Sequence, residues 1–256
     1  MNISYKVFNP TGNITILVDT PVAVCDQPVI AAKLMEHEPL AEQVGFVSCP
    51  NGQADIVLRM AGGEFCGNAT MSAAVYHQMK YGYQAGKTYD VSVRVIGIPE
   101  NVSCKVLFNG EDFEGDVVMP KNYYVSKERL YFEGKYYNYP IVKMGGISHL
   151  IIEEELPIFM AEQAIKQWCR DLRCEALGFM MVSENFSVLH PLVYVPVSDT
   201  LFWESSCASG SSAVAAYCQS ISGGDVHLDL LQPGGVLSVD ATSDNRVVLH
   251  GTVSQM

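Results

Sequence analysis

The sequence lacks several features that would each assign it to a functional class. Its 256 residues hold 16 Lys and Arg against 28 Asp and Glu, a formal net charge of −12. With no cluster of basic residues, this balance argues against nucleic acid or an anionic membrane surface as a partner. No apolar run approaches the ~18 residues that a membrane-spanning helix needs. The first residues, MNISYKVFNPTGN, show no basic segment followed by an apolar one, so we expect a cytoplasmic protein.

The spacing of the cysteines and histidines gives no sign of a metal site. The eight cysteines include no CxxC pair, which excludes the usual signals of a zinc ribbon or a thioredoxin-type dithiol. The histidines show no metal-ligand spacing, so we expect no metal. In a reducing compartment most cysteines are small buried hydrophobic residues. We expect this for six of them: Cys25, Cys49, Cys104, Cys169, Cys174 and Cys218.

The other two cysteines, Cys66 and Cys207, lie in segments that resemble each other. FCGNATMSAAVYHQ (65–78) and SCASGSSAVAAYCQ (206–219) align at an offset of 141 residues and are identical at four positions, the cysteine included. Each segment predicts a tight turn that leads into a helix of small residues. The alternative is a chance likeness between two Ala-rich helices.

The segments that follow these two helices weaken that alternative. Each is followed by three runs typical of half-buried strands, separated by Gly/Pro turns. A further amphipathic helix, at about 157–174, would only pack, through Ile158, Ala161, Ile165, Trp168 and Leu172. We therefore predict an α/β (α+β) protein of two pseudo-symmetric halves, each a curved sheet around a central helix. They span residues 1–119 and 120–256, and the last strand returns to the first half. The predicted strands are 89–96, 102–108 and 115–119, then 226–231, 236–239 and 246–253.

A cysteine at a helix start has distinctive chemistry. The first turn presents unpaired N–H groups and a partial positive charge. These should lower the pKa of the thiol, and they can bind a carboxylate. If two such cysteines face one amino acid in a cleft between the halves, one thiolate can remove the α-proton while the other thiol protonates the opposite face. This pattern predicts a racemase that needs no cofactor.

The same segments resemble a known family. GGEFCGNATMSAA and WESSCASGSSAVAA are similar to the two catalytic-cysteine segments of the diaminopimelate epimerases, which are PLP-independent and have two similar α/β domains. The likeness covers most of the chain. It is stronger to the histidine racemase branch, which serves staphylopine-type metallophore biosynthesis. The shared motifs are Asn-Pro-x-Gly-Asn, Glu-Gln-Val-Gly-Phe, Glu-Phe-Cys-Gly-Asn-Ala-Thr-Met-Ser, Trp-Glu-x-Ser-Cys-x-Ser-Gly and Gln-Pro-Gly-Gly.

The resemblance and the chemistry of helix starts and turns together imply roles for particular residues. Cys66 and Cys207 would be the acid–base pair. Glu42 would bind the imidazole or ammonium group of the substrate, and Asn13 its α-amino or carboxylate group. His149 would lie beside Cys66 and tune its protonation, and Glu204 would orient or cap the second helix start. Backbone N–H groups would hold the α-carboxylate at Gly67, Asn68, Ser209 and Gly210. The family also implies a homodimer.

Diaminopimelate is disfavoured as the substrate. The segment 197–203 contains no Arg, whereas the epimerases carry a Glu-Arg pair before the second cysteine to grip the distal carboxylate. Two alternatives to histidine racemisation remain. The chain could isomerise another amino acid or a related small carboxylate. It could also be a thiol-based ligand-binding or redox-sensing protein, since two facing thiols can form a disulfide.

Overall fold

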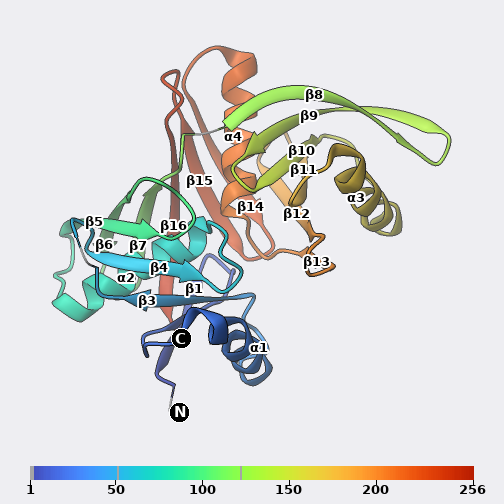
Figure 1. Ribbon diagram of the computed structural model, residues 1–256. Helices are drawn as coiled ribbons and strands as arrows, with labels where there is room; N and C mark the ends of the chain where they lie inside the picture. The colour runs from blue at the N-terminus through green and yellow to red at the C-terminus, as the bar shows by residue number, and fades with distance from the viewer. Residues whose placement is uncertain (1–2, 51, 122) are drawn as a thin grey trace. The chain divides into compact units, whose positions relative to one another are not determined.

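The computed structural model describes residues 3–50, 52–121 and 123–256 (Figure 1). The fold is mixed α+β and is dominated by strands. The chain divides into two compact units. The first consists of Met1–Met119 together with Val248–Met256, and the second of Pro120–Val247.

The first unit is a closed barrel. Its strands follow the order β1-β2-β3-β4-β5-β6-β7-β16, and the pairing of β1 with β16 closes the ring, with Phe8 opposite Gln255. Only β2–β3 and β4–β5 are parallel, and each pair is joined by a helical crossover, as parallel neighbours require. The strands are β1 (Tyr5–Pro10), β2 (Thr15–Val18), β3 (Gln43–Ser48), β4 (Ile56–Met60), β5 (Thr88–Val95), β6 (Val102–Phe108), β7 (Phe113–Val118) and β16 (Val247–Gln255).

Helix α2 (Gly67–Tyr81) runs through this barrel. It contacts β1, β2, β4, β5, β6 and β7, and 11 of its 15 residues are buried. Small side chains make this close packing possible. On β7 even a methyl group would be too large, because a Cβ at Gly115 would collide with Met71 of the helix.

Helix α1 (Gln27–His37) covers the outside of the same barrel, after the short 3-10 helix η1 (Val24–Asp26). Its Ala31 and Leu34 pack with Ile16 of β2 and Val44 of β3 in a separate apolar cluster. The barrel wall is therefore buried on both faces at this point, which explains why all four residues of β2 are buried.

The second unit is a curved sheet in the order β15-β14-β12-β11-β10-β9-β8, with the short β13 added to β12. Here β10–β11 and β12–β14 are the parallel pairs. Strands β8 and β9 form a long ribbon, drawn in light green in Figure 1. The strands are β8 (Tyr123–Phe132), β9 (Lys135–Met144), β10 (Ile147–Ile152), β11 (Leu177–Ser183), β12 (Val188–Val195), β13 (Thr200–Trp203), β14 (Val226–Gln232) and β15 (Gly235–Ala241).

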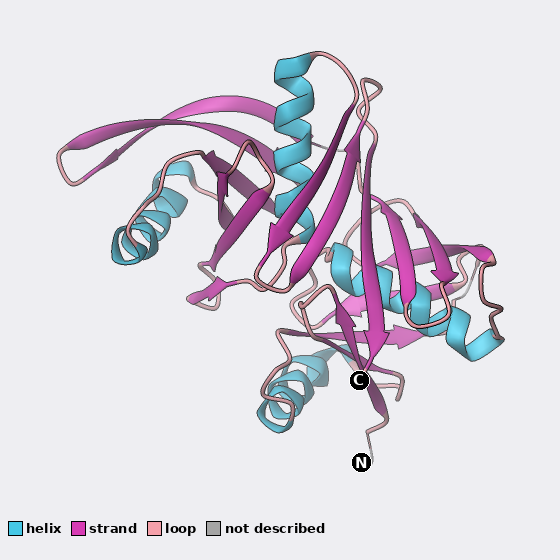
Figure 2. Cartoon of the chain, turned by 180° about the vertical axis from the view of Figure 1, so that it is seen from behind, coloured by secondary structure: helices cyan, strands magenta, loops and turns pink. Residues whose placement is uncertain are grey.

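Two helices cover the two faces of this sheet, as Figure 2 shows from behind. Successive residues of β11 point alternately to the two faces of the sheet, and so to the two helices. Leu177 and Phe179 point to α3 (Ile158–Leu172), whereas Gly178 and Met180 point to α4 (Ala208–Ser222). The face toward α3 holds an aromatic core in which Trp168 is completely buried and its indole N–H donates to the Tyr131 carbonyl (3.0 Å).

Most of the predicted secondary structure is confirmed. Helices α2 and α4 each have 15 residues, and α4 begins and ends 141 residues after α2. The three strands predicted after each helix are present, as is the helix predicted at 157–174. The apolar stripe assigned to that helix was wrong at its first position. Ile158 is the first residue of the helix and is 65% exposed, whereas Ala161 and Trp168 are completely buried. Among the described residues, no helix is long and apolar enough to cross a bilayer.

Candidate active site

Cys66 is the N-cap residue of α2. Its backbone is extended (φ −130°, ψ 118°), and its Sγ accepts the N–H of Ala69 at 3.4 Å. The Cys66 carbonyl accepts both the backbone N–H of Thr70 (3.0 Å) and its hydroxyl (2.7 Å). The thiol therefore replaces the hydroxyl of an ordinary N-cap, and it is held against the positive end of the helix.

Cys207 caps α4 with the same geometry. Its backbone angles are φ −122° and ψ 105°, and its Sγ accepts the Gly210 N–H at 3.3 Å. Its carbonyl accepts hydrogen bonds from the N–H and the hydroxyl of Ser211 (2.9 and 2.7 Å). Thr70 donates to the carbonyl of Cys66 in the same way. One further contact involves Gln232 of β14, whose Oε1 accepts the Cys207 N–H at 2.9 Å. The two helix starts are thus built alike, in one unit each.

The predicted lowering of a thiol pKa is wrong for Cys207. Its side chain is only 4% exposed, and burial raises its pKa well above 9.0. The carboxylate of Glu204 raises this pKa further through its charge and a hydrogen bond with the thiol. The Ser209 hydroxyl and the Gly210 N–H act in the opposite direction but are outweighed. The raised pKa favours the protonated thiol of Cys207, which can give a proton.

His149 lies with this second cysteine. It is completely buried on β10, and its Nε2 is 3.1 Å from the Ser209 hydroxyl, two residues after Cys207. The family resemblance associates this histidine with Cys66, but the contact recorded here is with the helix that begins after Cys207. Burial lowers the pKa of His149 to about 3, so the imidazole is neutral.

The first unit holds a second group of predicted residues. The Asn13 amide donates to Glu42 Oε2 at 2.5 Å, and Asn13 is itself nearly buried. Gln43 of β3 donates to Asn13 Oδ1 and to the Thr15 hydroxyl, the latter at 2.8 Å. Because its oxygen is occupied by Gln43, the Asn13 amide is oriented with its NH₂ toward the Glu42 carboxylate.

The backbone groups predicted to hold a carboxylate do not occupy equivalent positions in the two helices. Gly67 and Asn68 occupy the first two positions of α2, and the equivalent positions of α4 are Ala208 and Ser209. Gly210 is the third residue, and its N–H serves the Cys207 thiol, as that of Ala69 serves Cys66. The repeat therefore points to Ala208 in place of Gly210 as a group for a ligand.

Two supporting residues were missed from the sequence. The motif Glu-Gln-Val-Gly-Phe contains Gln43, but no local pattern marks its contact with Asn13. The motif Gln-Pro-Gly-Gly contains Gln232 but assigns it no role. Alternation along β14 could have found it, because Gln232 shares the inward face of Leu230 and is 3% exposed. A polar side chain at an inward position needs a partner.

The other cysteines are less uniform than expected. Cys104, Cys169 and Cys218 are buried, and burial raises the pKa of Cys104 to about 12. Cys25 and Cys49, by contrast, are exposed, so their assignment to the core was wrong. Cys25 belongs to a 3-10 helix without buried residues, and Cys49 follows the last residue of β3, where the strand leaves the barrel wall. Within the described parts of the chain, no cluster of three His, Cys, Asp or Glu residues could hold a metal ion.

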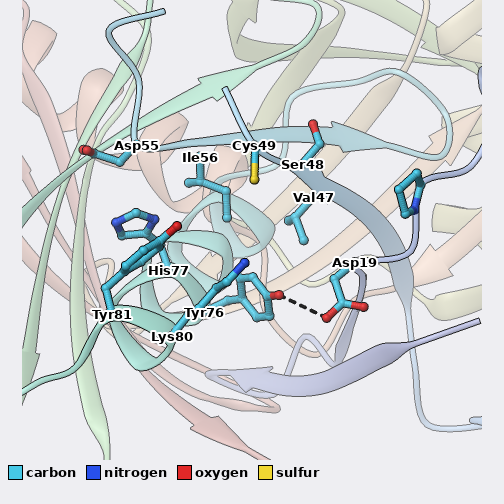
Figure 3. Close-up of a pocket in the computed structure, with 11 residues that line it drawn as sticks. Asp19, Val47, Ser48, Cys49, Asp55, Ile56, Tyr76, His77, Lys80 and Tyr81 are labelled. Atoms are coloured by element: carbon cyan, nitrogen blue, oxygen red, sulfur yellow. Dashed lines mark hydrogen bonds between the residues drawn. The ribbon is translucent and has the colours of Figure 1, made fainter. Parts of the chain in front are cut away.

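A pocket of about 260 Å³ lies in the first unit, at the end of α2 opposite to Cys66 (Figure 3). Tyr76, His77, Lys80 and Tyr81 line it from the last turns of the helix, and the Tyr76 hydroxyl donates to Asp19 at 3.1 Å. This pocket contains none of the predicted site residues, so it does not form part of the candidate active site.

Comparison with known proteins agrees with the family seen in the sequence. A family model described as "Histidine racemase CntK N-terminal domain" matches residues 2–255. A histidine racemase from Staphylococcus aureus is 31% identical, and the match covers 93% of this chain and 88% of that protein. A histidine racemase from Fusobacterium nucleatum is 30% identical over 96% of this chain and 92% of that protein.

Solved structures agree at the level of fold. A predicted epimerase from Pseudomonas aeruginosa superposes with a TM-score of 0.71 at 12% identity, covering 100% of this chain and 97% of the other. A probable proline racemase from Agrobacterium radiobacter gives 0.70 at 10% identity, covering 100% and 91%. The chain belongs to the histidine racemase family, and it is an isomerase of the amino-acid racemase type.

Proposed function

We propose that this chain interconverts L- and D-histidine by a two-base mechanism in which Cys66 and Cys207 act on opposite faces of the substrate α-carbon. The observation that carries the proposal is the repeated helix start, with a cysteine as N-cap, an N–H on its sulfur and a hydroxyl on its carbonyl. Family membership and the names of the relatives supply the substrate.

The reaction needs one thiolate and one thiol at any moment. For one enantiomer the Cys66 thiolate takes the α-proton, and the Cys207 thiol donates its proton to the other face of the planar carbanion. The two cysteines exchange protonation states, and the reverse reaction restores them. The raised pKa of Cys207 favours it as the protonated partner at the start of this cycle.

The helix starts also contribute to binding. The carbanion is stabilised when its carboxylate lies against oriented N–H groups, which need no reorganisation during the reaction. Gly67 and Asn68 in the first unit, and Ala208 and Ser209 in the second, are the proposed donors. No basic side chain is required for this carboxylate.

Glu42 is the proposed site for the imidazole. Its carboxylate suits a protonated or hydrogen-bonding ring and repels a second carboxylate, which disfavours diaminopimelate. The network from Gln43 through Asn13 supports the role, since it holds one carboxylate oxygen of Glu42 in place. The variant Glu42→Gln keeps the shape but loses the charge, and about a tenfold rise in KM for histidine is expected.

Two related domains would underlie this mechanism, residues 1–119 and 120–256, with the last strand returning to the first. Both units carry the same sequence of parallel and antiparallel pairings around their two crossovers, which supports this division. All eight cysteines are free thiols. Because the mechanism requires reduced thiols, we place the enzyme in the cytoplasm. The family resemblance alone supports a place in metallophore biosynthesis and a homodimer as the assembly.

The test is exchange of the α-hydrogen of L-histidine with deuterium from the solvent, using reduced protein without added cofactor. Cys66→Ser and Cys207→Ser should each lose about 10²–10⁴-fold in turnover, the contribution of a placed acid or base. Cys218→Ala is the matched control, because Cys218 also lies on α4 but ten residues after its first residue, Ala208. If the wild-type protein exchanged the α-hydrogen of other amino acids but not that of histidine, histidine would be excluded as the substrate. Full activity in either serine variant would reject the mechanism.

A further inference from the structure

Ser209 lies between a buried histidine and the thiol of Cys207. Its hydroxyl oxygen is 3.1 Å from His149 Nε2 and 3.6 Å from Cys207 Sγ. A serine hydroxyl carries one proton, so it can donate to only one of these neighbours at a time. The direction of that proton decides whether Ser209 stabilises the thiolate of Cys207.

The tautomer of His149 sets this direction. A neutral imidazole has one N–H and one bare nitrogen. Within the described part of the chain, Nδ1 has no hydrogen-bond partner, and it lies directly above Gly178, where an added Cβ would collide with it. Since a buried donor without a partner is rarer than a buried acceptor without one, the proton belongs on Nε2. Nε2–H then donates to the Ser209 oxygen.

We propose that His149 is a positioning residue for Cys207: its Nε2–H occupies the Ser209 oxygen and turns the Ser209 hydroxyl proton toward the Cys207 sulfur. The proposal deepens the proposed function, because it concerns the thiolate state through which Cys207 would pass. It needs no proton transfer to or from the imidazole, which stays neutral throughout.

The groups around the sulfur then divide into two sets. Glu204 accepts from the thiol and favours the protonated state. Ser209 and the Gly210 N–H both donate to sulfur and favour the thiolate. From the strands packed against α4, His149 on β10 acts through Ser209, and Gln232 on β14 binds the Cys207 backbone N–H. Cys207 is thus stabilised both as a thiol and as a thiolate. A group that acts first as an acid and later as a base needs both forms.

The first measurement is the nitrogen NMR spectrum of protein labelled at histidine, with the His149 signals assigned by their absence from His149→Gln. We expect the Nε2–H tautomer. A proton on Nδ1 would overturn the proposal, because the Ser209 hydroxyl would then donate to the imidazole and not to sulfur.

The second measurement is the rate of alkylation of Cys207 at constant pH, followed through the mass of the peptide that carries it. Ser209→Ala and His149→Leu should each slow the reaction about tenfold, the effect of losing one hydrogen bond to a charged group. His149→Gln should restore most of the rate, since its amide can donate from the Nε2 position. Ser212→Ala is the matched control, because that hydroxyl of α4 donates to the Ala208 carbonyl (2.8 Å).

Equal rates in wild type and Ser209→Ala would overturn the proposal, as would a rate in His149→Gln as low as in His149→Leu. Neither measurement requires turnover. If the tautomer and the rates are as expected but histidine is not racemised, the proposed function fails and the inference about Cys207 stands. If racemisation occurs but Ser209→Ala leaves the alkylation rate unchanged, the proposed function stands and the inference about Cys207 fails.

Discussion

The buried imidazole of His149 makes a specific prediction about stability in acid. Its pKa is lowered from the ordinary 6.5 to about 3 by burial, so the folded protein keeps it neutral while the unfolded chain takes up a proton. Above 6.5 both states are neutral and the group has no effect. As the pH falls below 6.5 the unfolded state binds the proton and gains free energy, so the folded state loses relative stability.

The size of the effect follows from the shift. A pH of about 5 is about 1.5 units below the pKa of this imidazole in the unfolded chain. Protonation there lowers the free energy of unfolding by about 2 kcal/mol. Other groups also titrate in this range. The comparison is therefore between wild type and His149→Gln, which cannot titrate at this position. The free energy of unfolding should fall by about 2 kcal/mol more in wild type between about pH 7.5 and pH 5.

Denaturant unfolding followed by tryptophan fluorescence suits this measurement. The chain has two tryptophans, and both Trp168 and Trp203 belong to the unit that contains His149. Trp168 is fully buried, so its emission changes when this unit unfolds. An identical pH dependence in wild type and His149→Gln would refute the reasoning, because it would mean that the folded protein protonates His149 as readily as the unfolded chain.

Two further predictions concern residues near His149 and Cys207. Gly178→Ala places a methyl group against His149 and should lower the free energy of unfolding by about 1–3 kcal/mol, as overpacking does; unchanged denaturant midpoints would contradict the close approach. Gln232→Leu leaves the buried N–H of Cys207 without its acceptor and should cost about 1–3 kcal/mol in the same assay.

Local sequence predicted the local structure well. The turn before each cysteine and the small residues after it predicted α2 and α4 and their capped starts, because an N-cap and a close-packed helix are decided by neighbouring residues. The strands after each helix followed from alternation in the same way. The long β8–β9 ribbon was not predicted, since YYVSKERLYF lacks a simple apolar-polar alternation.

Properties that depend on the environment were harder to predict. A helix start predicted a lower thiol pKa, but at Cys207 burial and Glu204 reverse the sign. The Ser209 contact of His149 spans 60 residues of chain, and no pattern in either segment reveals it. For the same reason Gln43, which binds Asn13 across 30 residues, appeared only with the structure.

The return of β16 to the first barrel has a consequence for how the protein is made. The second unit is continuous, from Pro120 to Val247, whereas the first needs Val248–Met256 to pair with β1 and β7. During synthesis the residues of the first unit that are translated first must therefore wait, with an unpaired barrel seam, until the whole second unit has been translated. The unit encoded later can complete its own sheet earlier. Closure of the barrel pairs β1 with β16 across the whole of the second unit in the sequence, so we expect it to be a slow, late event of folding.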